Sequence, residues 1–97
     1  MNMATSTIKN RYPKTKSFNV TLNIPANGSA NANLKTLIDA DMPSGCTCLG
    51  VVGFTTNDQS LFPISVRYAD TAYSLQIRNT YNGAFSDKKI GITYLYI

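Results

Sequence analysis

The side chains best suited to chemistry in this sequence are two aromatic rings in a segment that interrupts the alternating strand patterns. Tyr81 and Phe85 lie in the segment 79–87, which contains the turn-forming pair Asn82-Gly83. An exposed aromatic ring offers an apolar face and loses little rotamer entropy on binding, so a sugar ring can stack on it. We therefore expect a saccharide-binding site here or, in the alternative, rings that close the end of the fold. The expected site is formed by Tyr81, Phe85, Asn82, Asn79 and Asp87.

The composition excludes most catalytic and metal-binding chemistry. The chain has no His, and its five acidic residues are all Asp, so neither a His-based triad nor an imidazole metal site can form. Asp39 and Asp41 are closely spaced carboxylates, but two fall short of the roughly six to eight oxygen ligands that Ca²⁺ takes. Cys46 and Cys48 cannot complete a four-ligand zinc site by themselves, and we expect both to be reduced. We therefore expect no enzyme activity, no cofactor and no metal.

The net charge of +4 is concentrated at the N-terminus. Residues 1–16 hold Lys9, Arg11, Lys14 and Lys16 and no acidic residue, whereas the charges of the remaining residues cancel. We expect residues 1–16 to form a flexible basic arm, either simply solvated or used to dock onto another protein. Four charges separated by polar residues argue against a nucleic-acid partner.

Neither a secretory signal nor a membrane-spanning segment is visible in the sequence. The start lacks the apolar run of a signal peptide, and no stretch approaches the ~18 apolar residues of a spanning helix. We expect a protein that is made in the cytoplasm without a signal peptide and has no membrane partner.

Apolar and polar residues alternate along most of the chain, which is typical of strands with one buried face. In 17–24, Phe18, Val20, Leu22 and Ile24 alternate with Asn and Thr. The same pattern predicts further strands at 61–69, 73–78 and 88–97, and the largely apolar run 46–54 predicts one more.

Two segments need separate treatment. In 61–69, the alternation predicts an inward set of Phe62, Ile64, Val66 and Tyr68. In 30–45, Leu34, Leu37 and Ile38 have helical spacing and Asn33 is able to cap a helix. We nevertheless favour a short strand near 32–37, followed by an irregular loop over 39–45.

Two of the predicted strands are apolar on both faces. In 46–54, Leu49 and Val51 lie opposite Cys48, Val52 and Phe54, and in 88–97 the pair Leu95 and Ile97 lies opposite the main apolar set. Because so short a chain has a modest core, we expect the second faces to be covered by another subunit of a closed homo-oligomer. The alternative is that both faces serve one core within a single chain. The expected interface residues are Leu49, Val51, Leu95 and Ile97.

Short strands separated by turns about every ten residues predict an all-β fold. We expect an antiparallel β-sandwich or a small jelly-roll-like barrel of six to seven strands. With 97 residues in all, the chain has room for a single domain, over residues 17–97.

Three segments together resemble the C-terminal head domains of tail-fibre and receptor-binding proteins from bacteriophages and prophages of Gram-positive bacteria. They are Leu49-Gly50-Val51-Val52-Gly53, Leu75-Gln76-Ile77-Arg78-Asn79 and the final Tyr94-Leu95-Tyr96-Ile97. The resemblance covers about residues 17–97 and depends on the order and spacing of the segments. The chain differs from such heads in length, because they normally follow a long fibre shaft.

The resemblance implies a homotrimeric β-sandwich or jelly roll in the virion, which binds saccharide on the host surface without catalysis. The alternative is a structural virion protein, a decoration or capsid-associated fibre protein that docks onto other virion proteins through residues 1–16.

Overall fold

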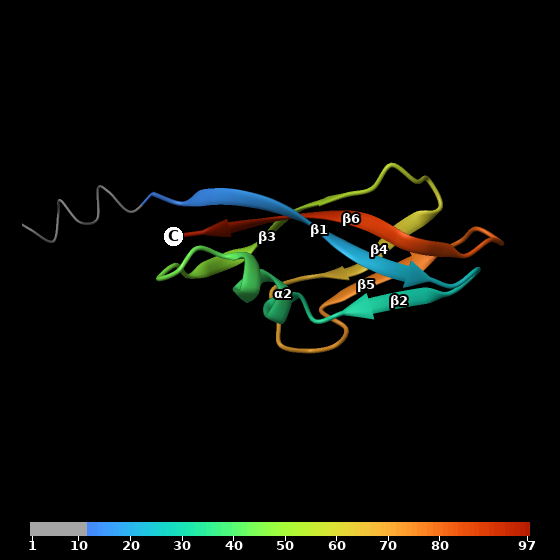
Figure 1. Ribbon diagram of the computed structural model, residues 1–97, viewed down its shortest axis with the longest axis horizontal. Helices are drawn as coiled ribbons and strands as arrows, with labels where there is room; N and C mark the ends of the chain where they lie inside the picture. The colour runs from blue at the N-terminus through green and yellow to red at the C-terminus, as the bar shows by residue number, and fades with distance from the viewer. Residues whose placement is uncertain (1–11) are drawn as a thin grey trace, which may run out of the picture.

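The computed structural model describes residues 12–97, in which strands form two three-stranded antiparallel sheets (Figure 1). One sheet has the order β1-β6-β3, and the other has the order β2-β5-β4. The expected antiparallel, mostly β class is confirmed, with one short helix in addition. The strands are β1 (Lys14–Ile24), β2 (Ser29–Ala32), β3 (Cys48–Thr55), β4 (Leu61–Val66), β5 (Leu75–Asn79) and β6 (Phe85–Tyr96), and the helix is α2 (Leu34–Asp41).

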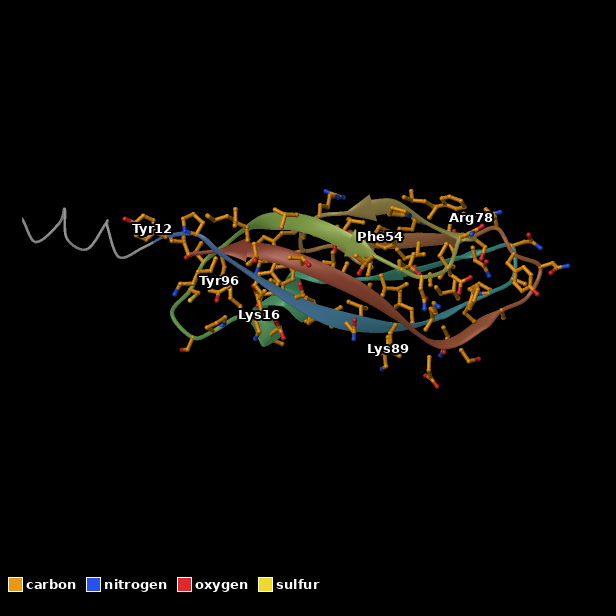
Figure 2. All side chains as sticks on the ribbon, turned by 90° about the horizontal axis from the view of Figure 1, so that it is seen from above. Tyr12, Lys16, Phe54, Arg78, Lys89 and Tyr96 are labelled. Carbon is orange, nitrogen blue, oxygen red and sulfur yellow. The ribbon has the colours of Figure 1, made fainter. Side chains whose placement is uncertain are left out.

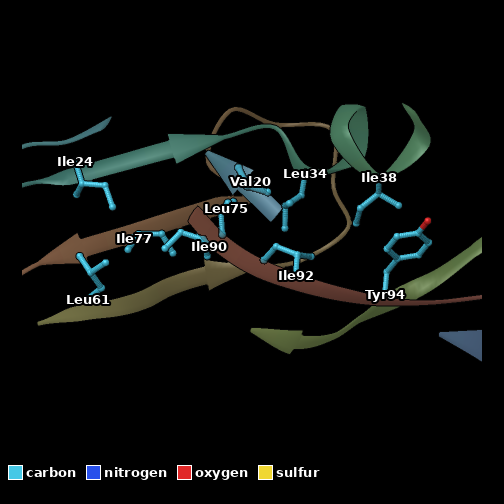
Figure 3. Packing of buried hydrophobic residues seen from close by; sticks show 10 residues of the cluster. All are labelled: Val20, Ile24, Leu34, Ile38, Leu61, Leu75, Ile77, Ile90, Ile92 and Tyr94. Atoms are coloured by element: carbon cyan, nitrogen blue, oxygen red, sulfur yellow. The ribbon is translucent and has the colours of Figure 1, made fainter. Parts of the chain in front are cut away.

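The core lies between the two sheets and contains side chains from both (Figure 3). Strand β6 is the centre of its sheet and contributes Ile90, Ile92 and Tyr94, which have no exposed surface. These three were expected on one face because of their period-two spacing, and this prediction is confirmed. The remaining buried hydrophobic residues are Val20, Ile24, Leu34, Ile38, Leu61, Leu75 and Ile77.

Strand β1 pairs with β6 from Lys14↔Tyr96 onward. Strand β1 therefore begins earlier than the predicted range of 17–24, and Lys14, Thr15 and Lys16 are sheet residues rather than part of a free arm. Residues 1–11 of the expected basic arm lie outside the described residues. Tyr12, at the start of the described chain, and Tyr96, at the end of β6, lie at the same end of the molecule (Figure 2).

The strand predicted near 32–37 is wrong, because this segment is mostly the helix α2. Asn33 caps the helix, since its side-chain oxygen accepts a hydrogen bond from the Thr36 N–H at 3.1 Å. Leu34 and Ile38, one helical turn apart, are fully buried against the end of the core. Within residues 12–97, no helix is long and apolar enough to cross a membrane.

Bulges reverse the expected faces over part of two edge strands, β3 and β4. The register of β3 shifts twice against β6, which turns Val51 toward the core and leaves Val52 exposed, opposite to the prediction. A shift between Pro63 and Ser65 of β4 likewise exposes Phe62 and Ile64, which were expected inside. One extra residue exchanges the two faces of a strand, and strict alternation cannot locate it.

Tyr94 joins β6 to the end of α2. Its hydroxyl donates a hydrogen bond to Asp41 Oδ2 at 2.8 Å, and Lys16 Nζ lies 3.4 Å from the same oxygen. Burial raises the pKa of Tyr94 above its ordinary value, and the bond to the Asp41 carboxylate raises it further. The folded protein therefore holds this tyrosine in its neutral form.

We predict that Tyr94 makes folding stability sensitive to alkaline pH. An unfolded tyrosine loses its proton near pH 10, whereas folded Tyr94 keeps it, so the free energy of unfolding falls as pH rises above about 10. In Tyr94→Phe this alkaline loss should be smaller, although the variant loses about 1.5 to 3 kcal/mol at neutral pH with its hydrogen bond to a carboxylate. Thermal melts between pH 7 and the alkaline range measure both effects.

Tyr73→Phe is the matched control, because Tyr73 is exposed and its hydroxyl makes no hydrogen bond within residues 12–97. It should retain the alkaline dependence of the wild-type protein. If the free energy of unfolding fell equally steeply at alkaline pH in Tyr94→Phe and in wild type, the pH dependence would not come from Tyr94.

Candidate functional site

Two turns meet at the end of the molecule that lies opposite the C-terminus (Figure 1). We call them, residues 25–28 and 79–84, the tip. The Asn27 N–H donates to the Tyr81 carbonyl at 2.8 Å, and the Asn79 N–H donates to the Gly28 carbonyl at 2.7 Å. The β1–β2 and β5–β6 connections are thus bonded to each other, although they are far apart in the sequence.

Asn79 is the polar centre of the tip and has no exposed surface. Its amide nitrogen donates to the Pro25 carbonyl at 3.1 Å and to the Gly83 carbonyl at 2.9 Å. Its Oδ1 accepts from the Tyr81 N–H at 2.9 Å. Asn79 was expected to contact a ligand directly, but it is a positioning residue, because its amide is buried and is bonded to the backbone of both turns.

Tyr81 projects from this framework with 55% of its surface exposed. The edge of its ring lies over Gly83, where a methyl group would come within 2.6 Å of ring carbon Cε2. A residue without a side chain at position 83 therefore leaves room for the ring. The structure places Tyr81 as expected, as an aromatic surface on a turn whose backbone is fixed.

Phe85 lies between the core and Tyr81. Its ring centroid lies 6.2 Å from that of Tyr81, at an interplanar angle of 46°. The Phe85 side chain is half-buried against the core, and the Lys88 ammonium lies 5.4 Å from the centroid of its ring. Phe85 therefore closes the end of the core and supports Tyr81, and it presents less free surface than Tyr81 does.

The two remaining expected site residues are exposed but differ in position. Asn82 follows Tyr81 directly in the turn. Asp87 lies where the β1–β6 register shifts, has a φ of 51°, and donates its backbone N–H to Asn23 Oδ1 at 2.9 Å. Beside it is a shallow pocket of about 240 Å³, lined by Asn23, Ile24, Pro25, Ala84, Phe85 and Ser86.

The expected interface residues leave apolar surface exposed in a single chain. Leu49 is 51% exposed, and Leu95 and Ile97 are partly exposed. Val51 packs against the core and, with Val52, lines a shallow hollow of about 220 Å³. Phe62 and Ile64 of β4 are also exposed, so β3 and β4, one edge strand from each sheet, carry exposed apolar side chains.

Asp39 and Asp41 are engaged in structural bonds. Asp39 accepts from the Tyr68 hydroxyl at 2.6 Å and from Lys35 Nζ at 2.7 Å. The hydrogen bond from Lys35, followed by that from Tyr68, lowers the pKa of the Asp39 carboxyl. In the described part of the chain, no group of three or more His, Cys, Asp or Glu residues is placed to hold a metal ion. Cys46 and Cys48 are unpaired thiols, and burial raises the pKa of Cys48.

A polar groove that was not predicted from the sequence lies on the outer face of the β1-β6-β3 sheet. It consists of two adjoining hollows of about 450 and 320 Å³ that share Asn19, Thr55 and Gly91. The signal in the sequence was a glycine, Gly91, at a position of β6 that the alternation of apolar and polar residues assigns to the outward face. Asn19 and Thr55 could not be placed beside Gly91 without the order of the strands in the sheet, and the sequence did not reveal that order.

We predict that Asn79→Ala destabilises the protein by about 1 to 3 kcal/mol, because it leaves the Tyr81 N–H and two carbonyls without their buried partner. Asn82→Ala, an exposed change in the same turn, should stay within about 0.5 kcal/mol of wild type. Urea unfolding measures the free energy of unfolding of both variants. Equal stability of Asn79→Ala and Asn82→Ala would show that the buried amide does not hold the tip.

Comparisons with known protein families, curated proteins and solved structures found no match to this chain. The resemblance to phage receptor-binding heads therefore stays a prediction that depends on the quoted segments.

Proposed function

We propose that this protein is a non-enzymatic saccharide-binding module, the receptor-binding head of a bacteriophage virion, which contacts the host cell surface through its tip. The observation that supports this most is Tyr81, an exposed ring on a turn whose backbone is held by the buried Asn79 amide. Aromatic side chains whose position is fixed before binding lose little entropy when a ligand packs on them.

The tip offers the two kinds of contact that a sugar needs. The apolar face of a pyranose ring packs on Tyr81, with Phe85 beside it at 6.2 Å between centroids. The exposed Asn82 side chain donates and accepts hydrogen bonds with sugar hydroxyls, and the exposed Asp87 carboxylate accepts them. Asn79 acts through the backbone by fixing Tyr81.

The position of the tip also suits a head that is attached at its other end. Strand β1 begins, and β6 ends, at the end of the molecule opposite to the tip (Figure 1). A ligand on a cell surface therefore reaches Tyr81 without meeting the attachment. We place the protein on the extracellular virion particle for the same reason.

We further propose a β-sandwich fold that assembles as a homotrimer. Two sheets enclosing one core favour the sandwich over a closed barrel. The trimer is supported by exposed apolar residues on the edge strands β3 and β4, since such edges invite pairing when nothing covers them. Leu49 and Val52 of β3, with Leu95 and Ile97, form the proposed contact surface.

The second candidate is a structural virion protein that docks onto other virion proteins through its basic N-terminal residues. It is favoured by the position of Lys14 and Lys16 in β1, at the end remote from the tip. This candidate requires particle attachment but no saccharide binding.

We predict that the protein binds surface glycans of Gram-positive bacteria and that Tyr81→Ala weakens this binding at least about tenfold, equivalent to about 1.4 kcal/mol. Purified cell walls and a glycan array provide the measurement. Gly83→Ala should also weaken binding, because the added methyl group displaces the Tyr81 ring.

Tyr73→Ala is the control, since Tyr73 is 59% exposed but lies in the loop between β4 and β5. It should bind as wild type does. The proposal fails if the wild-type protein binds none of these glycans, or if Tyr73→Ala and Tyr81→Ala lose affinity equally.

A further inference from the structure

The polar groove on the outer face of the β1-β6-β3 sheet is separate from the tip, and the proposed function does not use it. Its two hollows meet at Gly91 and together run from Ser17 and Thr93 to Asn57 and Lys88. The Ser17 and Thr93 hydroxyls are joined by a hydrogen bond of 2.6 Å.

Gly91 is the floor of the groove. It lies on the central strand, between Asn19 of β1 and Thr55 of β3. A Cβ atom at position 91 would collide with the Thr55 hydroxyl, which leans over the glycine. The missing side chain leaves room for the Thr55 hydroxyl, so the floor of the groove stays low at Gly91, with the Asn19 amide on one side and the Thr55 hydroxyl on the other.

The polar groups around this hollow are available to a ligand. Asn19, Thr55 and Lys89 are all exposed. No side-chain hydrogen bond within residues 12–97 uses the Asn19 amide, the Thr55 hydroxyl or the Lys89 ammonium. Burial of these groups under a ligand therefore replaces bonds to water with bonds to the ligand.

The charge of the groove is positive and is only partly neutralised. Two lysines, Lys88 and Lys89, line the groove, and the described residues that line it include no acidic side chain. Lys88 is bonded to Asp58 at 2.9 Å and to Asn57 at 3.0 Å. The salt bridges within residues 12–97 do not involve Lys89, which lines the same hollow.

We propose that this groove binds an acidic saccharide chain, with one sugar ring lying over Gly91. The Asn19 amide and the Thr55 hydroxyl bond the hydroxyls of that ring, and Lys89 pairs with a negatively charged substituent, a carboxylate or a phosphate, on the chain.

The lining favours a saccharide over other anionic polymers. Single-stranded nucleic acid is usually held by exposed aromatic rings on which bases stack. The aromatic residue that lines this groove, Phe18, instead packs against the core, 6.0 Å from the Tyr94 ring. A lining of amide and hydroxyl groups around a glycine suits a ligand rich in hydroxyls.

The probes are a galacturonic acid hexamer, its neutral methyl ester and an oligomannose chain that carries mannose 6-phosphate, each titrated into the ¹⁵N-labelled full chain. Either the hexamer or the phosphorylated oligomannose should shift the amide signals of Asn19, Thr55 and Gly91, and the two results distinguish a carboxylate from a phosphate ligand. The methyl ester should bind at least about tenfold more weakly than the hexamer if the carboxylate is recognised. A chain of deoxythymidine is the nucleic-acid probe.

Lys89→Gln should weaken binding of the active probe about tenfold. Lys14→Gln, the same change of charge at an exposed residue of β1 outside the groove, should change it less than about twofold. Tyr81→Ala should leave it unchanged, so failure of the tip proposal and failure of this one are distinguishable. Three results overturn the inference: no shifts at the groove with either acidic probe, equal losses in the two Lys variants, or tighter binding of the deoxythymidine chain.

Discussion

The buried amide of Asn79 joins two turns that are far apart in the sequence, and main-chain hydrogen bonds join the same two turns. It bonds the backbone at Pro25, Tyr81 and Gly83, and the main-chain bonds of Asn27 and Asn79 run between the same two turns. A buried polar group of this kind is stable only when its partners are all in place, so it specifies one conformation of the surrounding backbone. The exposed ring of Tyr81 gets its fixed position from this arrangement.

The short chain also explains where surface is left for function. Eight of the ten buried apolar side chains come from the inner faces of the strands, and Leu34 and Ile38 come from α2. Surfaces left outside this core include the end of the fold, the outer face of β1-β6-β3 and the edges β3 and β4. Each has a different character: the end is aromatic, the outer face is polar and basic, and the edges are apolar. We assign a different kind of contact to each of them for that reason.

The sequence predicted the elements whose alternation is uninterrupted. Ile90, Ile92 and Tyr94 were placed correctly because β6 is regular over its buried half. It could not predict the faces of Val51, Val52, Phe62 and Ile64, since a bulge is a response to pairing with a neighbouring strand.

The other differences between the prediction and the structure arise from tertiary contacts. The Asn33 cap and the spacing of Leu34 and Ile38 favoured a helix, and the fit of both side chains into the core decided between helix and strand. Tyr81 was recognisable as an exposed aromatic residue in a turn. The burial of Asn79 and the groove over Gly91 both depend on segments that are distant in the sequence.

Amide hydrogen exchange of the full chain tests most directly whether Asn79 holds the tip rigid. The Tyr81 amide, bonded to Asn79 Oδ1, and the Asn27 amide, bonded to the Tyr81 carbonyl, are the reporters. Both should exchange within about tenfold of the rate of the Ile77 amide in β5, because they open only when the tip unfolds. Exchange as fast as that of the Asn82 amide in the exposed turn would contradict the account.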